Sequence, residues 1–115
     1  MTGNKEWNEI SDLNDLQHIK KESHRRKALI FKHSTRCGTS RMVLRRFESK
    51  LTELNENYDL YFLDLLQYRN ISNAIEAEFQ VKHESPQLIL IENEKAVKSA
   101  SHYDILELTE TMVKD

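Results

Sequence analysis

The sequence of 115 residues is poor in the residue types that shape turns and cross-links, because it has two glycines, one proline and one cysteine. Average usage would give a chain of this length roughly eight glycines and six prolines. A single cysteine cannot form a disulfide within the chain, which excludes the disulfide-stapled scaffold of a small secreted protein. Since Gly3 lies close to the N-terminus, the rest of the chain holds one residue of each type: Cys37, Gly38 and Pro86.

Long apolar runs and an excess of one charge are also missing. No stretch approaches the roughly 20 apolar residues of a membrane span, and the opening Met-Thr-Gly-Asn-Lys-Glu-Trp lacks the apolar run of a signal peptide. Seventeen basic residues against nineteen acidic ones give a net charge of -2, so no basic excess exists to neutralise nucleic-acid phosphates. We therefore expect a cytoplasmic protein without a membrane or nucleic-acid partner.

The residues that are present fit one compact domain spanning 1–115, with 38% hydrophobic and 31% charged residues. At its start, residues 7–10 precede Ser11, which is typical of a helix N-cap. Apolar residues then recur at helical spacing up to Glu22. The opening is therefore predicted to be a strand followed by a helix.

The segment around Cys37 changes from the pattern of a strand to that of a helix. Residues 28–31 form a short apolar run bounded by charge, which is the pattern of a strand covered on both faces. From Gly38 onward, apolar residues fall on one helical face as far as Asn55 or Asn57, which predicts an amphipathic helix. Cys37 is therefore predicted to lie where a buried strand passes into a helix.

The rest of the chain continues this alternation of strands and helices. The predicted elements are a strand over 58–66, a helix opened by Ser72, strands over 87–92 and 96–100 joined by a turn at Asn93 and Glu94, and a last helix with a capping box at Ser101 and Asp104. Both faces of a sheet with parallel strands need helical cover. We therefore expect an α/β fold, a three-layer α/β/α sandwich around a mixed sheet, with an N-terminal βα extension.

Cys37 is expected to have a reactive thiol. At a helix N-terminus, unsatisfied backbone N–H groups and the positive end of the helix dipole favour the thiolate, and Arg36 and Arg41 add positive charge nearby. Gly38 lacks a Cβ, so a second sulfur or a small substrate can approach the backbone closely. Ser40 stands where a dithiol enzyme has its second cysteine, so it can donate a hydrogen bond but cannot resolve a mixed disulfide. A second thiol must come from another molecule.

Pro86 is a second candidate site residue, because it stands at the start of a predicted strand. A cis Ser85–Pro86 bond at this point would turn a main-chain edge towards the thiol. The alternatives are an ordinary trans proline, an inert buried Cys37, and a Ser40 that only satisfies donors of the first helical turn.

The order of strand, Cys-x-x-Ser, helix, strand, helix, Ser-Pro, hairpin and helix resembles the thioredoxin fold. In detail, nearly the whole chain resembles the YtxJ family of monothiol bacilliredoxins, with the likeness carried by residues 31–41, 69–75 and 83–87. The resemblance implies a cytoplasmic stress-response protein that exchanges disulfides with bacillithiol, a small thiol that some bacteria use in place of glutathione.

The same resemblance implies roles for the candidate residues. Cys37 would be the nucleophile, Pro86 the cis proline facing it, and Ser85 would offer its backbone to the incoming thiol. The residues expected to support the thiolate are Arg36, Gly38, Thr39, Ser40 and Arg41, and those expected to contact the substrate are Lys32, Thr35, Ser85 and Pro86. Independently of the resemblance, Lys32 is a candidate anchor for a carboxylate of the small thiol, with a solvated surface charge as the alternative.

No tightly bound cofactor and no metal are expected. The five histidines show no close paired spacing, so a zinc site is not predicted, and His33 and His83 are expected to be solvated loop residues unless they tune the thiolate. The expected partners are the low-molecular-weight thiol as co-substrate, S-thiolated client proteins and a reductase. The chain itself would be a monomer or a weak dimer.

Other functions remain open. The family commonly has proline after the cysteine, so Cys37-Gly38 is more similar to monothiol glutaredoxins, which suggests an iron–sulfur cluster carrier as an alternative. Residues 37–41 are similar to the motif of thioredoxin-fold arsenate reductases, although the 19 residues 67–85 leave no room for the helical insertion of those enzymes. A non-catalytic thioredoxin-like interaction module is a further alternative.

Gln80 and Glu94 stand where related sequences often use glycine.

Overall fold

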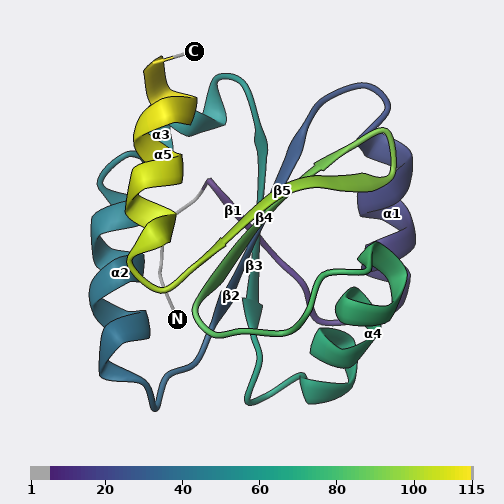
Figure 1. The fold of residues 1–115 in the computed structure, drawn as a ribbon. Helices are drawn as coiled ribbons and strands as arrows, with labels where there is room; N and C mark the ends of the chain where they lie inside the picture. Colours follow the sequence, from purple (N-terminus) through teal and green to yellow (C-terminus); the bar gives the residue numbers. More distant parts are fainter. Residues whose placement is uncertain (1–5, 115) are drawn as a thin grey trace.

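The computed structural model describes residues 6–114 and is built around a mixed sheet of five strands (Figure 1). The strands are β1 (Trp7–Glu9), β2 (Ala28–His33), β3 (Asp59–Asp64), β4 (Gln87–Glu92) and β5 (Lys95–Ser101), in the spatial order β1-β3-β2-β4-β5. β3 is parallel to β1 and β2, whereas β4 is antiparallel to β2 and β5. The predicted mixed sheet with its N-terminal βα extension is confirmed. Residues 1–5 and 115 of the predicted 1–115 domain lie outside the described residues.

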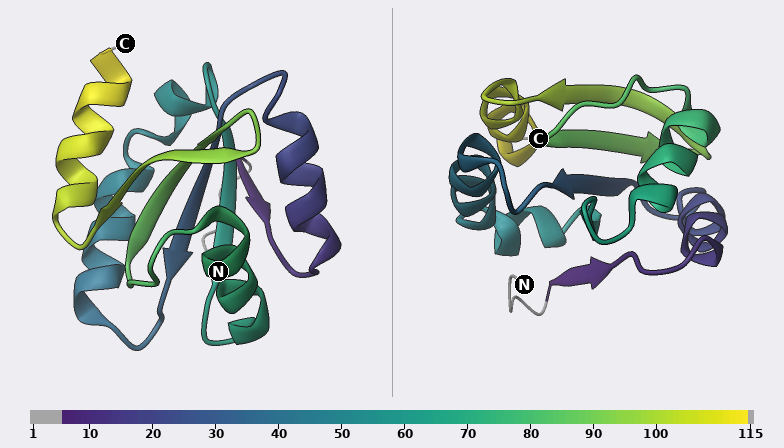
Figure 2. Two further views of the ribbon diagram at one scale, coloured as in Figure 1. Left: turned by 45° about the vertical axis from the view of Figure 1, so that its right-hand side comes forward. Right: turned by 90° about the horizontal axis from the view of Figure 1, so that it is seen from below.

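Helices cover both faces of the sheet (Figure 2). They are α1 (Asn14–Glu22), α2 (Gly38–Glu48), α3 (Leu51–Asn55), α4 (Arg69–Phe79) and α5 (Asp104–Lys114). Side chains of β2 alternate between two hydrophobic clusters, so Phe31 packs under α2 and α5, and Ile30 packs under α1 and α4. The three-layer α/β/α arrangement follows from this two-sided burial. Among the described residues, no helix is long and apolar enough to cross a membrane.

Trp7 packs β1 against α2 and the neighbouring strand β3. Its ring stacks on Phe47 of α2 with centroids 5.7 Å apart, and it also contacts Phe62 of β3 at 5.4 Å. The indole N–H donates to Oε2 of Glu48 at 2.8 Å, so the polar edge of this buried ring is satisfied. These contacts explain how a strand of three residues keeps its place at the edge of the sheet.

The single helix predicted from Gly38 to Asn55 or Asn57 is divided in two. α2 ends at Glu48 and α3 begins at Leu51. Between them, the N–H groups of Ser49 and Lys50 donate to carbonyls three residues earlier, at 3.2 and 3.0 Å. The apolar residues on both sides of this tight turn enter the same hydrophobic cluster. The apolar residues therefore keep their helical spacing across the turn, so the sequence pattern did not indicate the break between α2 and α3.

Three predicted helix starts were wrong. Ser11 does not cap α1, because the carboxylate of Asp15 instead accepts the N–H of Ser11 at 2.9 Å and α1 begins at Asn14. α4 begins before Ser72, which is buried inside the helix, and Ser101 lies in β5 rather than at the N-cap of α5. A serine ahead of an apolar run therefore did not locate these helix starts, and at α1 the local carboxylate of Asp15 binds the N–H groups before the helix instead.

At positions where glycine is common, this chain has other residues in left-handed backbone conformations. Gln80 ends α4 with φ 55°, and the β4–β5 turn has Asn93 at φ 51° and Glu94 at φ 69°. Such a conformation costs an L-amino acid roughly 1–2 kcal/mol. The chain therefore forms this helix end and this turn without glycine, at some expense of stability.

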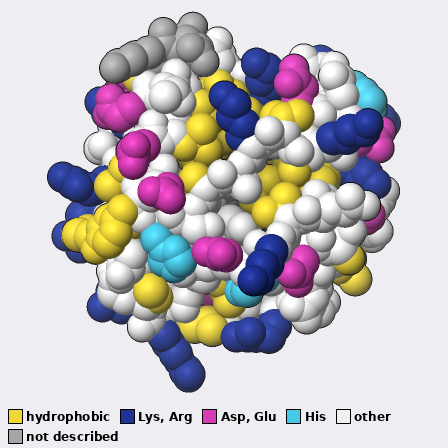
Figure 3. All heavy atoms as spheres, in the orientation of Figure 1, with side chains coloured by type: hydrophobic (Ala, Val, Ile, Leu, Met, Phe, Trp, Pro, Cys, Tyr) yellow, Lys and Arg dark blue, Asp and Glu magenta, His cyan; other side chains and the backbone are white. Residues whose placement is uncertain are grey.

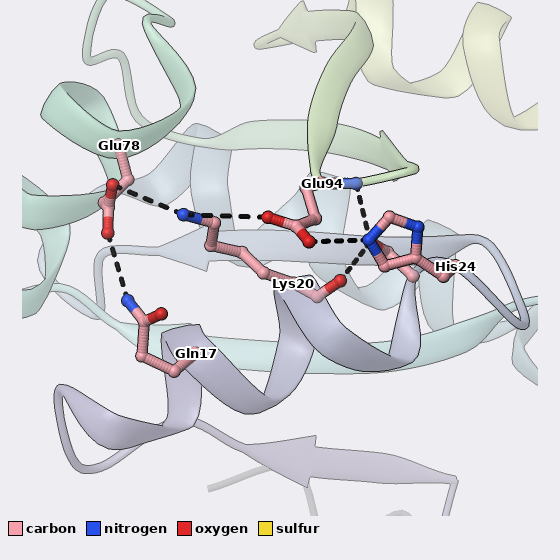
Figure 4. Close-up of polar contacts among 6 residues, drawn as sticks. Gln17, Lys20, His24, Glu78 and Glu94 are labelled. Atoms are coloured by element: carbon pink, nitrogen blue, oxygen red, sulfur yellow. Dashed lines mark hydrogen bonds and ion pairs between the residues drawn. The ribbon is translucent and has the colours of Figure 1, made fainter.

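Charged side chains of both signs are interspersed on the face seen in Figure 3, with apolar atoms between them. At the turn between β4 and β5, charged side chains of the hairpin, of α1 and of α4 contact one another (Figure 4). Glu94 accepts from Nε2 of His24 at 2.6 Å, and Lys20 lies 4.0 Å from Glu94 and 3.7 Å from Glu78. The Ser23 hydroxyl accepts the backbone N–H of Glu94 at 2.8 Å. The partly exposed ion pairs add little stability individually, so their effect is mainly to orient the hairpin.

Candidate functional site

Cys37 is the N-cap residue of α2, at the point where β2 passes into the helix. Its backbone is extended, with φ -99° and ψ 120°, and its carbonyl accepts the N–H of Arg41 at 3.1 Å as the first bond of the helix. The N–H of Cys37 donates to the carbonyl of Ser34 at 3.2 Å, which closes a turn between strand and helix. The thiol-bearing residue is half-buried. The predicted passage from buried strand to helix is confirmed.

The Ser85–Pro86 peptide bond is cis, and it lies at the same end of the sheet as Cys37. β2 and β4 are antiparallel with Lys32 opposite Gln87, so the end of β2 lies beside the start of β4. Figure 1 shows the segment between α4 and β4 crossing the end of the sheet at which β2 runs towards α2. The register therefore brings Ser85 and the buried Pro86 towards the loop that holds Cys37.

Ser40 holds this loop from inside the molecule. Its Oγ accepts the N–H of Ser34 at 3.1 Å and lies 2.8 Å from Nδ1 of His33. Burial lowers the pKa of His33, which favours the neutral ring, and Nδ1 of this ring shares one hydrogen bond with the Ser40 hydroxyl. Ser40 is completely buried, so the hydrogen bond expected from it is directed into the core.

His33 was predicted to be a solvated loop residue, and this prediction is wrong. It is the last residue of β2, is 5% exposed, and packs on the ring of Phe62 with centroids 5.7 Å apart. The apolar run ends at Phe31, but strand pairing with β3 continues to His33 opposite Asp64. A polar residue at this position remains buried because Ser40 provides its hydrogen bond.

The arginine and threonine side chains of the loop lie on the surface. Arg36, Arg41 and Thr35 are exposed, while Thr39 in the first turn of α2 is half-buried. Nη1 of Arg41 donates to the carbonyl of Thr35 at 2.9 Å, which fixes the guanidinium against the loop. A Cβ at Gly38 would lie 3.9 Å from Nη2 of Arg41, an ordinary contact distance. The chain's own packing therefore tolerates a Cβ here, and only an approaching molecule would benefit from its absence.

A cavity of about 320 Å³ opens beside this loop. Its lining residues are His33, Thr35, Arg41, Leu44, Arg45, Glu48 and Phe62. Arg41 and Arg45 stand one helical turn apart on α2, and Glu48 is engaged by the indole of Trp7. The cavity therefore combines apolar side chains with two guanidinium groups against one carboxylate, and this net positive lining suits a small anionic ligand.

Lys32 lies away from the surface. Its side chain is completely buried, and Nζ is 2.7 Å from Nδ1 of His83. Burial lowers the pKa of Lys32 to about 8. An external carboxylate cannot reach this ammonium group without displacing the covering segment. The role expected for Lys32 as an anchor for a carboxylate of the small thiol therefore does not fit its buried place in the structure.

The partners of Lys32 were missed by the sequence reasoning. His83 Nδ1 also lies 3.3 Å from Oγ of Ser72, and the backbone N–H of His83 donates to Glu76 at 3.0 Å. The signal that could have found them was a lysine directly following a fully apolar run, because a buried lysine needs a polar partner. The described part of the chain holds no group of three or more His, Cys, Asp or Glu residues placed to bind a metal ion.

Comparisons with known proteins agree with this geometry. The model of the family described as monothiol bacilliredoxin BrxC matches residues 8–109. A solved structure described as a candidate oxidoreductase with a thioredoxin fold is similar at a TM-score of 0.80 and 27% identity, over 95% of this chain and 94% of that one. Thioredoxins of Malassezia sympodialis and Fasciola hepatica match at TM-scores of 0.73 and 0.75, with 17% and 19% identity, over 92% of this chain and 87% and 96% of theirs. The thioredoxin-like fold expected from the sequence is confirmed.

Proposed function

The chain belongs to the monothiol bacilliredoxin family, and we propose that it uses Cys37 to remove bacillithiol from S-thiolated proteins. The observation that carries the proposal is the position of Cys37, half-buried at the N-cap of the 11-residue helix α2. Free N–H groups and the positive end of a helix favour the thiolate, which is the nucleophile in disulfide exchange. The sequence offers no second cysteine, so the resolving thiol is external.

The proposed reaction exchanges one disulfide for another. The Cys37 thiolate attacks the bacillithiol sulfur of a client mixed disulfide, a bond forms between these two sulfurs, and the client–bacillithiol bond breaks. The client thiolate leaves and takes a proton from water, so the client is reduced while Cys37 becomes S-thiolated. A second small thiol then attacks the adduct, which frees Cys37 and releases a small disulfide for a reductase.

The residues around Cys37 have separate tasks in this proposal. The exposed guanidinium groups of Arg36 and Arg41 supply positive charge on the loop that holds Cys37. The Ser85 main chain, ahead of the cis bond to Pro86, offers an edge for a short β-like pairing with the client. Gly38 has no Cβ, which would let the mixed disulfide approach the backbone beside Cys37 closely.

We propose that the small thiol binds in the 320 Å³ cavity beside the loop, which is lined by Thr35 and Arg41. Lys32 is buried, so the cationic partners for the carboxylate of the small thiol would be Arg41 and Arg45. A lone reactive thiol of this kind works in a reducing compartment, which favours the cytoplasm. S-thiolated clients accumulate under oxidation, so we place the activity in a stress response.

Intact-protein mass spectrometry tests the proposal. The chain is mixed with a client protein that carries one bacillithiol, and both masses are followed over time. We expect the wild type to gain one bacillithiol as the client loses it, and Cys37→Ser to gain none. If wild type and Cys37→Ser leave the client equally modified, the proposed function is wrong.

A further inference from the structure

One buried contact joins the two segments of the proposed site. Lys32 belongs to β2, the strand that leads to Cys37, and His83 belongs to the segment that leads to Pro86. Their side chains meet with Nζ and Nδ1 2.7 Å apart. Residues 81–84 belong to no helix or strand, so side-chain contacts must fix the course of this segment.

The contact is enclosed by protein. Lys32 is 0% exposed, and burying an ammonium group is costly unless it is hydrogen-bonded. The charged groups that act on Lys32 and His83 are Glu76 and Arg69 of α4 and Glu84 of the same segment. An uncharged leucine or methionine would fill this space without that cost, so the lysine is not explained by packing.

The protonation states assign the direction of the hydrogen bond. An ammonium group has only donors, so the Lys32 Nζ donates and Nδ1 of His83 accepts. Burial and the neighbouring Lys32 lower the pKa of His83, which favours the neutral ring. Since Nδ1 accepts from Lys32, the proton of the neutral ring belongs on Nε2. The backbone N–H of His83 donates to Glu76 at 3.0 Å, so this residue is held from two sides.

A second contact of the same strand pair holds the segment. Gln87 lies opposite Lys32 in the β2–β4 ladder, so both side chains are on the sheet face covered by α4. Its Nε2 donates to the carbonyl of Lys82 at 2.9 Å. Lys32 and Gln87 of the sheet thus bind two consecutive residues of the segment, His83 and Lys82 respectively.

We propose that Lys32 is a positioning residue, which through His83 holds residues 81–86 and therefore the Ser85–Pro86 edge in place for the client. The inference rests on the proposed thiol exchange, in which that edge pairs with the client backbone. Lys32 touches neither sulfur, so its loss affects client binding more than the reactivity of the thiol.

Lys32→Met tests this, because methionine keeps the length and apolar stem of lysine but cannot donate. Lys82→Met is the matched control, since Lys82 is exposed in the same segment. Hydrogen exchange followed by mass spectrometry should show the amides of residues 81–85 and 87 exchanging about tenfold faster in Lys32→Met, the loss expected for one buried hydrogen bond. Lys82→Met should match the wild type.

Kinetics supply the second readout. In Lys32→Met, we expect KM for a client mixed disulfide to rise about tenfold with kcat nearly unchanged, since ground-state binding is what is lost. Alkylation of Cys37 by iodoacetamide does not use the client edge and should keep its rate. His83→Asn, whose Oδ1 can accept from Lys32, should retain a KM near that of the wild type, whereas His83→Leu should resemble Lys32→Met.

Several outcomes would overturn the inference. They are unchanged amide exchange in a folded Lys32→Met, alkylation slowed as strongly as client exchange, or a wild-type His83 ring that NMR shows protonated on Nδ1 at neutral pH. The NMR measurement decides even if Lys32→Met does not fold. If the wild type fails to exchange disulfides, the proposed function is wrong, while amide exchange still reports whether Lys32 holds the segment.

Discussion

Gln80 ends α4 in a left-handed conformation, with φ 55°, that glycine adopts without steric cost. Its side chain is exposed, so replacing it removes little packing. We expect Gln80→Gly to raise the free energy of unfolding by about 1 kcal/mol. Urea denaturation measures this change.

Gln17→Gly is the matched control for this prediction. Gln17 is also exposed but lies within α1, where glycine costs about 1 kcal/mol relative to a good helix former. The two Gln-to-Gly exchanges should therefore change stability in opposite directions. A Gln80→Gly protein less stable than the wild type would show that the left-handed residue carries no strain.

At the scale of elements, the His33–Ser40 hydrogen bond joins the end of β2 to the first turn of α2. Burial lowers the pKa of His33 below its ordinary value of 6.5, so the unfolded chain binds a proton there more readily than the folded one. The stability from the neutral ring is present above pH 6.5 and is lost as pH falls through the folded pKa. We expect the free energy of unfolding to decrease as the solution is acidified below pH 6.5.

Urea titrations at a series of pH values test this link between strand and helix. His33→Gln, which cannot titrate, should show a shallower decrease in stability than the wild type. The exposed His18→Gln should follow the wild-type slope. Because burial also lowers the pKa of His83, some slope should remain in His33→Gln. Equal slopes in wild type and His33→Gln would contradict the assignment.

The strand-to-helix passage at Cys37 could be predicted because its signals are local, namely an apolar run followed by a change of period. The turn at Ser49 and Lys50 could not, because the apolar stripe continues across it. The burial of Lys32 depends on His83, 51 residues further along the chain, and no local pattern relates the two residues. The site was thus predictable where one segment makes it and not where two segments meet.

At the scale of the whole molecule, a net charge of -2 gives no general attraction for anions. The positive charge available to a small anionic thiol is therefore local. It comes from Arg41 and Arg45 at the cavity beside the loop, whose two positive charges exceed the single negative charge of Glu48 there. Selectivity for a carboxylate-bearing thiol should depend on these two side chains rather than on the overall field.

Arg45→Gln tests this localisation against Arg46→Gln, which removes the same charge from a neighbouring residue that lines a different cavity. The substrates are one client peptide bound through a disulfide to thioglycolate, which has a carboxylate, or to mercaptoethanol, which does not. Loss of an exposed ion pair worth about 0.2–1 kcal/mol lowers kcat/KM by up to about fivefold. We expect that loss only for Arg45→Gln with the thioglycolate substrate, and we expect added salt to diminish it. Equal losses for both substrates, or for both variants, would mean that the cavity does not select the anionic thiol, because a charge acting at long range does not distinguish Arg45 from Arg46.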